Sequence, residues 1–363
     1  MVRIATRLTL ATAAALALSA PALAQTEQVR IDPDGARRAP LLLERNPRFE
    51  APQFERGLEV PVVRMTWRER DAQELIDAVG ATVAVMLHGD APDRMPEGMD
   101  AALKEALFGN EGGTWTRIPA APQMLVKYDR PFDEFRLINE ELDVIREPVG
   151  RVGIEDAQAR AETILQALIE RKVVDAQLYR NAAMQLGYRR VGRGTTEGRP
   201  DLGQIVEYRI TYRPRIEGIE LANAGVRIGL LTDGAVSSMR VGGVTPSGTF
   251  REGRLRPEDG GMRRDIEIAP SELMTRFYRA LPPNAAPEIA WSKVMYAMSD
   301  DARSALVEPQ LLISFSERHP TDEGQWVTSR RRILGFSLVD PEASPFDYTA
   351  ATGRGGDEPR REQ

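Results

Sequence analysis

Hydrophobic positions follow a helical spacing in some stretches of the chain and a strand-like alternation in others. The clearest helical stretch covers residues 154–169, where apolar side chains recur three and four positions apart. Gly153 precedes this stretch, and Glu155 and Asp156 fall in its first turn, where the helix dipole favours acidic side chains. The pattern predicts an amphipathic helix with one buried face.

The clearest strand-like stretch covers residues 205–213, where apolar and polar side chains alternate. Tyr208 and Tyr212 fall on the apolar face, so we expect them to pack against a helix. Two further apolar runs, 226–231 and 235–241, flank an Asp-Gly pair, which favours a β-hairpin. Together with the helix, these strands predict a helix laid across a curved antiparallel sheet.

Helical and strand-like patterns also follow one another, less clearly, on both sides of this region. Candidate helices cover residues 71–79, 100–107 and 270–281. Candidate strands cover residues 123–128, 134–139, 288–298, 307–315 and part of 326–339. These patterns predict an α+β fold, with helices packed on curved antiparallel sheets in tandem modules.

Changes in composition divide the chain into six predicted parts. They are a signal peptide (1–24), an extended lead-in (25–58), an N-terminal α+β region (59–150), an α+β module (151–250), a second α+β module (262–342) and a disordered tail (343–363). The lead-in and the tail are rich in Pro, Gly and charged residues and show little periodicity. The remaining length is enough for two or three domains.

Several motifs in residues 153–244 have counterparts in one known family. They are the helix, the polar loop after it, the strand from Tyr208 to Tyr212, the turn around Gly218 and the strand pair around Gly234. This order resembles the PepSY and related peptidase-propeptide modules, which are small cystatin-like α+β domains of secreted bacterial proteins. A fainter echo covers residues 271–339. The resemblance implies a module that binds a partner or modulates a peptidase, and it implies no catalytic residue.

The first 24 residues have the pattern of a secretory signal peptide. Arg3 and Arg7 precede an uncharged stretch at 8–20, and Ala22 and Ala24 are small residues at the positions that signal peptidase reads. We expect cleavage after Ala24 and a periplasmic or secreted protein. No later segment reaches 18 uninterrupted apolar residues, so no transmembrane segment is expected.

The overall composition excludes several classes of function. The chain carries 54 acidic and 48 basic residues, a net charge of −6, which argues against nucleic acid as a partner. It has no cysteine, so disulfides, thiol catalysis and thiolate metal sites are excluded.

Histidine and serine chemistry has little support in the sequence. The two histidines, His88 and His319, fall in different predicted regions, and we interpret them as a strand-end residue and a loop residue. A zinc or catalytic site would need both of them together with carboxylates. Trp291-Ser292-Lys293 has the wrong spacing for a serine–lysine dyad and lies in a predicted strand.

Two acidic motifs could provide chemistry that needs neither histidine nor serine. Asp300-Asp301 and Glu140-Glu141 could act as general acid and base, but both lie in turn-like, solvated stretches. The Asp-Pro-Asp-Gly stretch at 32–35 is similar to the start of a calcium loop, but its proline and the lack of a glutamate about six residues after the glycine break the pattern.

The densest positive run is at residues 330–332, where three arginines could meet an acidic partner or a polysaccharide. We interpret them as residues of a strand edge that face water. A peptide partner would instead add to an exposed edge of the sheet that contains residues 205–213.

These observations predict an exported, non-enzymatic protein that binds a protein or peptide partner in the cell envelope or modulates a peptidase. No cofactor, metal or nucleic acid is expected. Two alternatives stay open. One is an envelope hydrolase that uses two carboxylates about 5 to 9.5 Å apart in a cleft. The other is a structural component of an envelope assembly.

Overall fold

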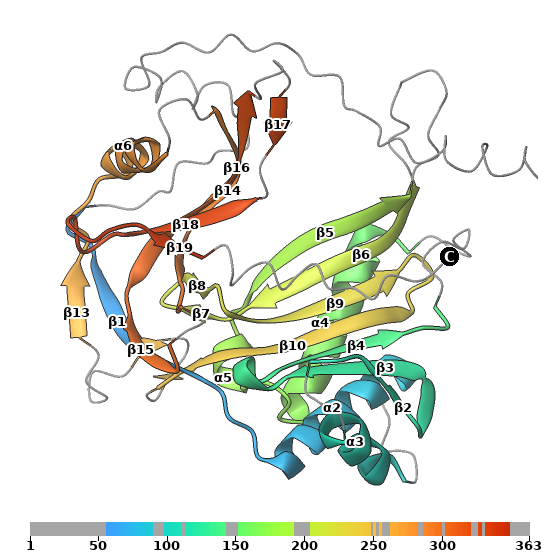
Figure 1. Ribbon diagram of the computed structural model, residues 1–363. Coiled ribbons are helices and arrows are strands. Elements are labelled where there is room, and N and C mark those ends of the chain that lie inside the picture. Colours follow the sequence, from blue (N-terminus) through green and yellow to red (C-terminus); the bar gives the residue numbers. More distant parts are fainter. Residues whose placement is uncertain are drawn as a thin grey trace, which may run out of the picture.

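The structure is a computed structural model that describes residues 56–89, 98–109, 113–142, 152–191, 204–247, 250–251, 254–255, 262–281, 286–299, 302–320, 326–328 and 331–348. More of these residues lie in strands than in helices, and the strands form two large sheets (Figure 1). The predicted α+β class of tandem helix-on-sheet modules is therefore wrong. The reason is that stretches without clear alternation, such as residues 183–191, become strands by pairing with a neighbouring strand.

The larger sheet is antiparallel and contains strands from most of the chain. Its main path runs through β2 (Thr116–Ile118), β3 (Ala121–Asp129), β4 (Glu134–Asn139), β10 (Val236–Pro246), β9 (Ala224–Leu231), β6 (Gln204–Arg213) and β5 (Ala183–Val191). The predicted hairpin is confirmed as β9–β10, with Gly234 at a positive φ of 87° in its turn. The predicted strand at 205–213 is confirmed as β6.

Helices cover one face of this sheet. They are α2 (Ala72–His88), α3 (Met99–Phe108), α4 (Ile154–Glu170) and the short α5 (Ala176–Tyr179), and they share one hydrophobic core with the sheet. Tyr208 and Tyr212 of β6 are buried in this core, as predicted. α2 runs well past the predicted end at residue 79, because residues 78–87 are apolar on nearly every side and are buried between the sheet and the other helices.

The smaller sheet contains β19 (Phe346–Asp347), β18 (Arg332–Ser337), β16 (Pro309–Pro320), β14 (Ala286–Tyr296), β8 (Ile219–Leu221) and β7 (Arg215–Ile216), with β17 (Trp326–Thr328) paired to β16. α6 (Pro270–Ala280) packs on it through Phe277, whose ring lies 5.0 Å from that of Phe315 and 6.2 Å from that of Phe336. These elements confirm the predicted helix at 270–281 and the predicted strands at 288–298 and 307–315.

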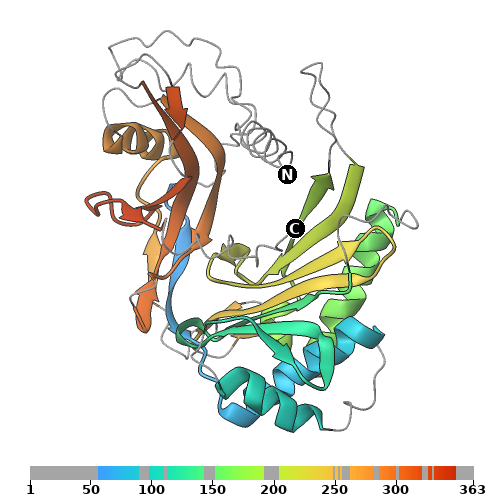
Figure 2. The ribbon, with the colours of Figure 1, turned by 45° about the vertical axis from the view of Figure 1, so that its right-hand side comes forward.

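The two sheets are joined by strands that follow each other closely in the chain or that pair with several partners. β7 and β8 come directly after β6 but belong to the smaller sheet. β1 (Glu59–Trp67) pairs with β10, with β13 (Met262–Asp265) and with β15 (Ser304–Val307). Figure 2 shows the sheets meeting at an angle, with α2, α3 and α4 on the outer side of the larger sheet. A separate two-stranded ribbon is formed by β11 (Phe250–Arg251) and β12 (Arg254–Leu255).

The two ends of the chain lie mostly outside the described residues. This holds for the predicted signal peptide, for nearly all of the lead-in and for residues 349–363. Residues 343–348 are not a disordered tail, because β19 pairs with β18 and the Tyr348 side chain is buried. The Tyr348 hydroxyl donates to the backbone oxygen of Ala297 at 3.1 Å. Among the described helices, none combines the length and the apolar character needed to cross a bilayer.

Candidate functional site

The two histidines do not lie in the predicted elements. His88 is the exposed last residue of α2, not the end of a strand. His319 belongs to β16, where its backbone pairs with Val327, so it is not a loop residue. Within the described ranges, no group of three or more His, Asp or Glu side chains could hold a metal ion.

The charged motifs singled out from the sequence are dispersed over the structure. Asp300-Asp301 and the stretch at 32–35 lie outside the described residues. Glu140 is exposed and pairs with Arg117, as expected for a solvated position. Arg332 does not lie on a sheet edge, because β18 has β16 on one side and β19 on the other. Its guanidinium pairs with Glu317 and Asp347, at 2.9 Å each.

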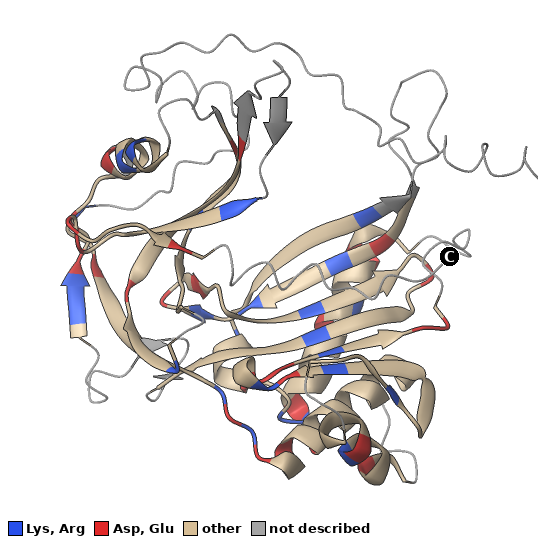
Figure 3. Cartoon of the chain, viewed as in Figure 1, with Lys and Arg blue, Asp and Glu red and all other residues tan. Residues whose placement is uncertain are grey.

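The most prominent feature that sequence reasoning missed is a row of cations on the open face of the larger sheet. Strand register places Lys127 of β3 opposite Arg136 of β4, Arg136 opposite Arg240 of β10, and Arg240 opposite Arg227 of β9. Directly opposite residues point to the same face, so these four side chains form one line across four strands. We call this line the cationic row. Figure 3 shows the basic positions of β4, β10 and β9 side by side.

Carboxylates on this face neutralise only part of its charge. Glu134 pairs with both Arg136, at 2.7 Å, and Arg240. Glu207 of β6, on the same face, pairs with Arg209 of that strand at 3.0 Å. Among the described residues, these contacts leave Arg227 of the row without a direct carboxylate partner.

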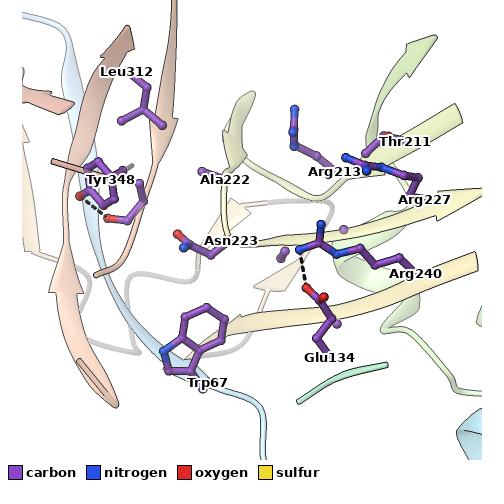
Figure 4. Close-up of a pocket in the computed structure, with 14 residues that line it drawn as sticks. Trp67, Glu134, Thr211, Arg213, Ala222, Asn223, Arg227, Arg240, Leu312 and Tyr348 are labelled. Carbon is purple, nitrogen blue, oxygen red and sulfur yellow. Dashed lines mark hydrogen bonds and ion pairs between the residues drawn. The ribbon is translucent and has the colours of Figure 1, made fainter. Parts of the chain in front are cut away.

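At one end of this face, where the two sheets meet, lies a small cavity of about 100 Å³ that we call the junction pocket. Arg213, Arg227 and Arg240 line it from the larger sheet. Across from them lie Trp67, Asn223, Leu312 and Tyr348 (Figure 4). The pocket therefore combines a strongly basic wall with a wall that is largely apolar.

Arg227 is the arginine of this wall that lacks a partner. Arg240 pairs with Glu134, and Arg213 donates to the side-chain oxygen of Gln185 at 2.6 Å. Within the described residues, Arg227 makes no hydrogen bond or ion pair. Burial, followed by repulsion from Arg240 and the other nearby arginines, lowers the pKa of Arg227 to about 10. Its guanidinium is still charged at neutral pH, so the pocket holds a half-buried cation that contacts no carboxylate directly among the described residues, although Glu134 lies near enough to interact with it electrostatically.

The opposite wall is held by hydrogen bonds to backbone groups. Trp67 donates its indole N–H to the backbone oxygen of Ala302 at 3.0 Å, and its ring packs edge-on against Phe132. The side-chain oxygen of Asn223 accepts from the backbone N–H of Met298 at 2.7 Å. These bonds fix the pocket in advance of any ligand, which reduces the entropy lost on binding.

Close approach of two strands also shapes the pocket. A Cβ atom at Gly242 of β10 would lie 2.5 Å from the Cα atom of Glu134. Only glycine allows β10 to lie so close to the start of β4, and this closeness places Glu134 where it reaches Arg240.

A second, larger hollow lies elsewhere and has mixed charge. It has a volume of about 940 Å³ and is lined by Arg68, Lys172 and Arg303 together with Glu69 and Asp175. Arg68 and Arg303 already donate to backbone oxygens. Its remaining cation, Lys172, is exposed to solvent, whereas Arg227 in the junction pocket is half-buried.

Comparisons with known proteins leave the function open. No protein-family model and no curated protein matches the sequence. The chain is similar to the crystal structure of an uncharacterized protein from Eubacterium rectale ATCC 33656, with a TM-score of 0.43 and 8% identity over 81% of this chain and 90% of that one. A likeness of this degree carries no functional conclusion. The resemblance to PepSY modules gains no support from a family match and stays a prediction.

Proposed function

We propose that the chain is a binding protein whose ligand places an anionic group, such as a carboxylate or a phosphate, in the junction pocket. The observation that carries this proposal is the unpaired guanidinium of Arg227, with the like charges of Arg213 and Arg240 on the same wall. An anion there would offset the burial, and the repulsion from neighbouring arginines, that lower the pKa of Arg227. Guanidinium groups also bind carboxylates and phosphates through two parallel hydrogen bonds, which gives strength and orientation.

The pocket favours binding over the carboxylate-dependent hydrolysis considered from the sequence. Hydrolysis of that kind needs two acidic side chains that face each other across the substrate. Among the described residues that line the pocket, Glu134 is the one carboxylate, and two arginines already pair with it. Glu134 is therefore suited to holding the arginines in place.

The predicted setting in the cell envelope is part of the proposal. A protein or peptide partner could supply the anion as an acidic side chain or as a C-terminal carboxylate. The prediction of export rests on the first 24 residues alone. If it is right, protein recovered from a secreting host should begin at Gln25. Intact mass measurement would show this, and a mass that includes residues 1–24 would contradict it.

Thermal unfolding with and without inorganic phosphate tests the anion site, at constant ionic strength. A ligand that binds only the folded state raises the unfolding temperature. We expect phosphate to stabilise the wild type but not Arg227→Gln. The matched control is Arg117→Gln, which removes an arginine from the β2 end of the sheet, outside the pocket. If Arg227→Gln responds to phosphate as the wild type does, the proposed site is wrong.

A further inference from the structure

We infer that the partner presents an extended acidic peptide segment, which lies across β9, β10, β4 and β3 along the cationic row. This inference rests on the proposed function, because the junction pocket would hold one carboxylate of the same segment. It adds the class of the partner and the direction in which that partner binds.

The length of the row fits a peptide with acids at alternate positions. Neighbouring strands lie about 4.8 Å apart, so the row from Arg227 to Lys127 covers three spacings, or about 14 Å. In an extended peptide, side chains two positions apart point the same way, and four positions span about 13.5 Å. Three acids at alternate positions therefore cover the row from end to end.

The surface beside the row lets a peptide backbone approach. The positions next to Arg227 on the open face of β9 are Gly225 and Gly229, and Ser238 and Gly242 lie opposite them on β10. None of these residues has a side chain that could stand between the arginines and a ligand. The arginine side chains are half-buried against this floor, so less conformational freedom is lost when a carboxylate binds them.

The same face is poorly suited to an acidic polysaccharide. Sugar rings bind proteins largely by packing on exposed aromatic side chains, and the described positions of the row and of its small neighbours include no aromatic residue. Trp67 lies in the junction pocket but is only 6% exposed. Charge complementarity without an aromatic platform favours a peptide.

Fluorescence anisotropy with two labelled peptides of identical composition tests the inference on the purified protein. One peptide carries three glutamates at alternate positions among threonines, and the other carries the three glutamates in succession. We expect the alternating peptide to bind about tenfold more tightly, the effect of one additional charged hydrogen bond. An oligogalacturonate of similar charge should bind more weakly than the alternating peptide.

Variants separate the row from the pocket. Arg136→Gln should weaken binding of the alternating peptide about tenfold while the protein still responds to phosphate, because Arg136 lies in the row but does not line the pocket. Lys127→Gln gives the same readout if Arg136→Gln does not fold. Arg227→Gln should abolish both responses.

Two results would overturn the inference while the proposed function survives. In both, the phosphate response still depends on Arg227. The first is that the peptide data show no effect of the row, either because the two peptides bind equally or because neither row variant changes peptide binding. The second is that the oligogalacturonate binds more tightly than either peptide. If phosphate does not stabilise the wild type, or stabilises Arg227→Gln equally, the proposed function itself is refuted.

Discussion

The ion pair between Arg70 and Asp133 gives the sharpest prediction for stability. Both side chains are almost completely buried, with 2% and 1% of their surface exposed. Asp133→Asn keeps the shape of the side chain, and asparagine tolerates the positive φ of 42° at this position. The substitution therefore removes the negative charge and little else.

The expected loss is large because the charge of Arg70 stays behind. Removing one partner of a buried pair costs about 3 to 5 kcal/mol, since the other charge is left without compensation. Arg70 also donates to the backbone oxygen of Val173 at 3.0 Å, which holds the guanidinium in the interior. Arg70→Met should cost a similar amount, because it leaves the carboxylate of Asp133 buried. The double variant Arg70→Met/Asp133→Asn should cost less than the sum of the two single changes.

Urea unfolding followed by circular dichroism at neutral pH would measure these free energies. Burial raises the pKa of Asp133 more than the Arg70 guanidinium lowers it. A carboxyl whose pKa is raised by folding adds stability at acid pH, and that stability is lost as the pH rises through the folded-state pKa. The cost of Arg70→Met should therefore shrink at acid pH, where Asp133 is neutral. A loss below about 1 kcal/mol for Asp133→Asn, or strict additivity in the double variant, would refute this reasoning.

Two further predictions concern the walls of the junction pocket. Truncation after Tyr348 should leave the urea midpoint unchanged. Truncation after Glu342 removes the buried Tyr348 ring and should lower the free energy of unfolding by about 3 to 5 kcal/mol. Equal stability of the two truncated chains would contradict the packing of residues 343–348. Gly242→Ala should cost about 1 to 3 kcal/mol and weaken the phosphate response, because its Cβ would lie 2.5 Å from Glu134. Gly187→Ala is the matched control in the same sheet, since its nearest contact would be an ordinary 3.6 Å, and a similar loss in both variants would count against the steric explanation.

Local pattern was sufficient to predict the elements whose signal lies within a few neighbouring residues. The spacing at 154–169 and the alternation at 205–213 correspond to α4 and β6. β5 was missed, because residues 183–191 mix a glycine and two arginines among their apolar residues and become a strand only by pairing with β6. The fold class was wrong for the same reason, since pairing between distant segments turned several unpatterned stretches into strands.

The candidate site was beyond the reach of the sequence because it depends on register. The alternation in β6 did place Arg209 and Arg213 on a polar face. Nothing local, however, indicates that Arg240 meets Glu134, a residue 106 positions away. The basic residues of the row are also hidden in an acidic chain, where net charge gives no sign of a positive face.

The placement of β1 has a consequence for how the chain reaches its native state. This strand is made early, but Thr66 pairs with Thr245 of β10, and Val63 pairs with Val307 of β15. Its backbone groups thus have no native partners until most of the chain has been synthesised. Because contacts of such long sequence separation form slowly, β1 is left as an exposed, apolar strand during synthesis. We therefore expect the urea-unfolded protein to refold slowly, with the pairings of β1 among the last contacts to form.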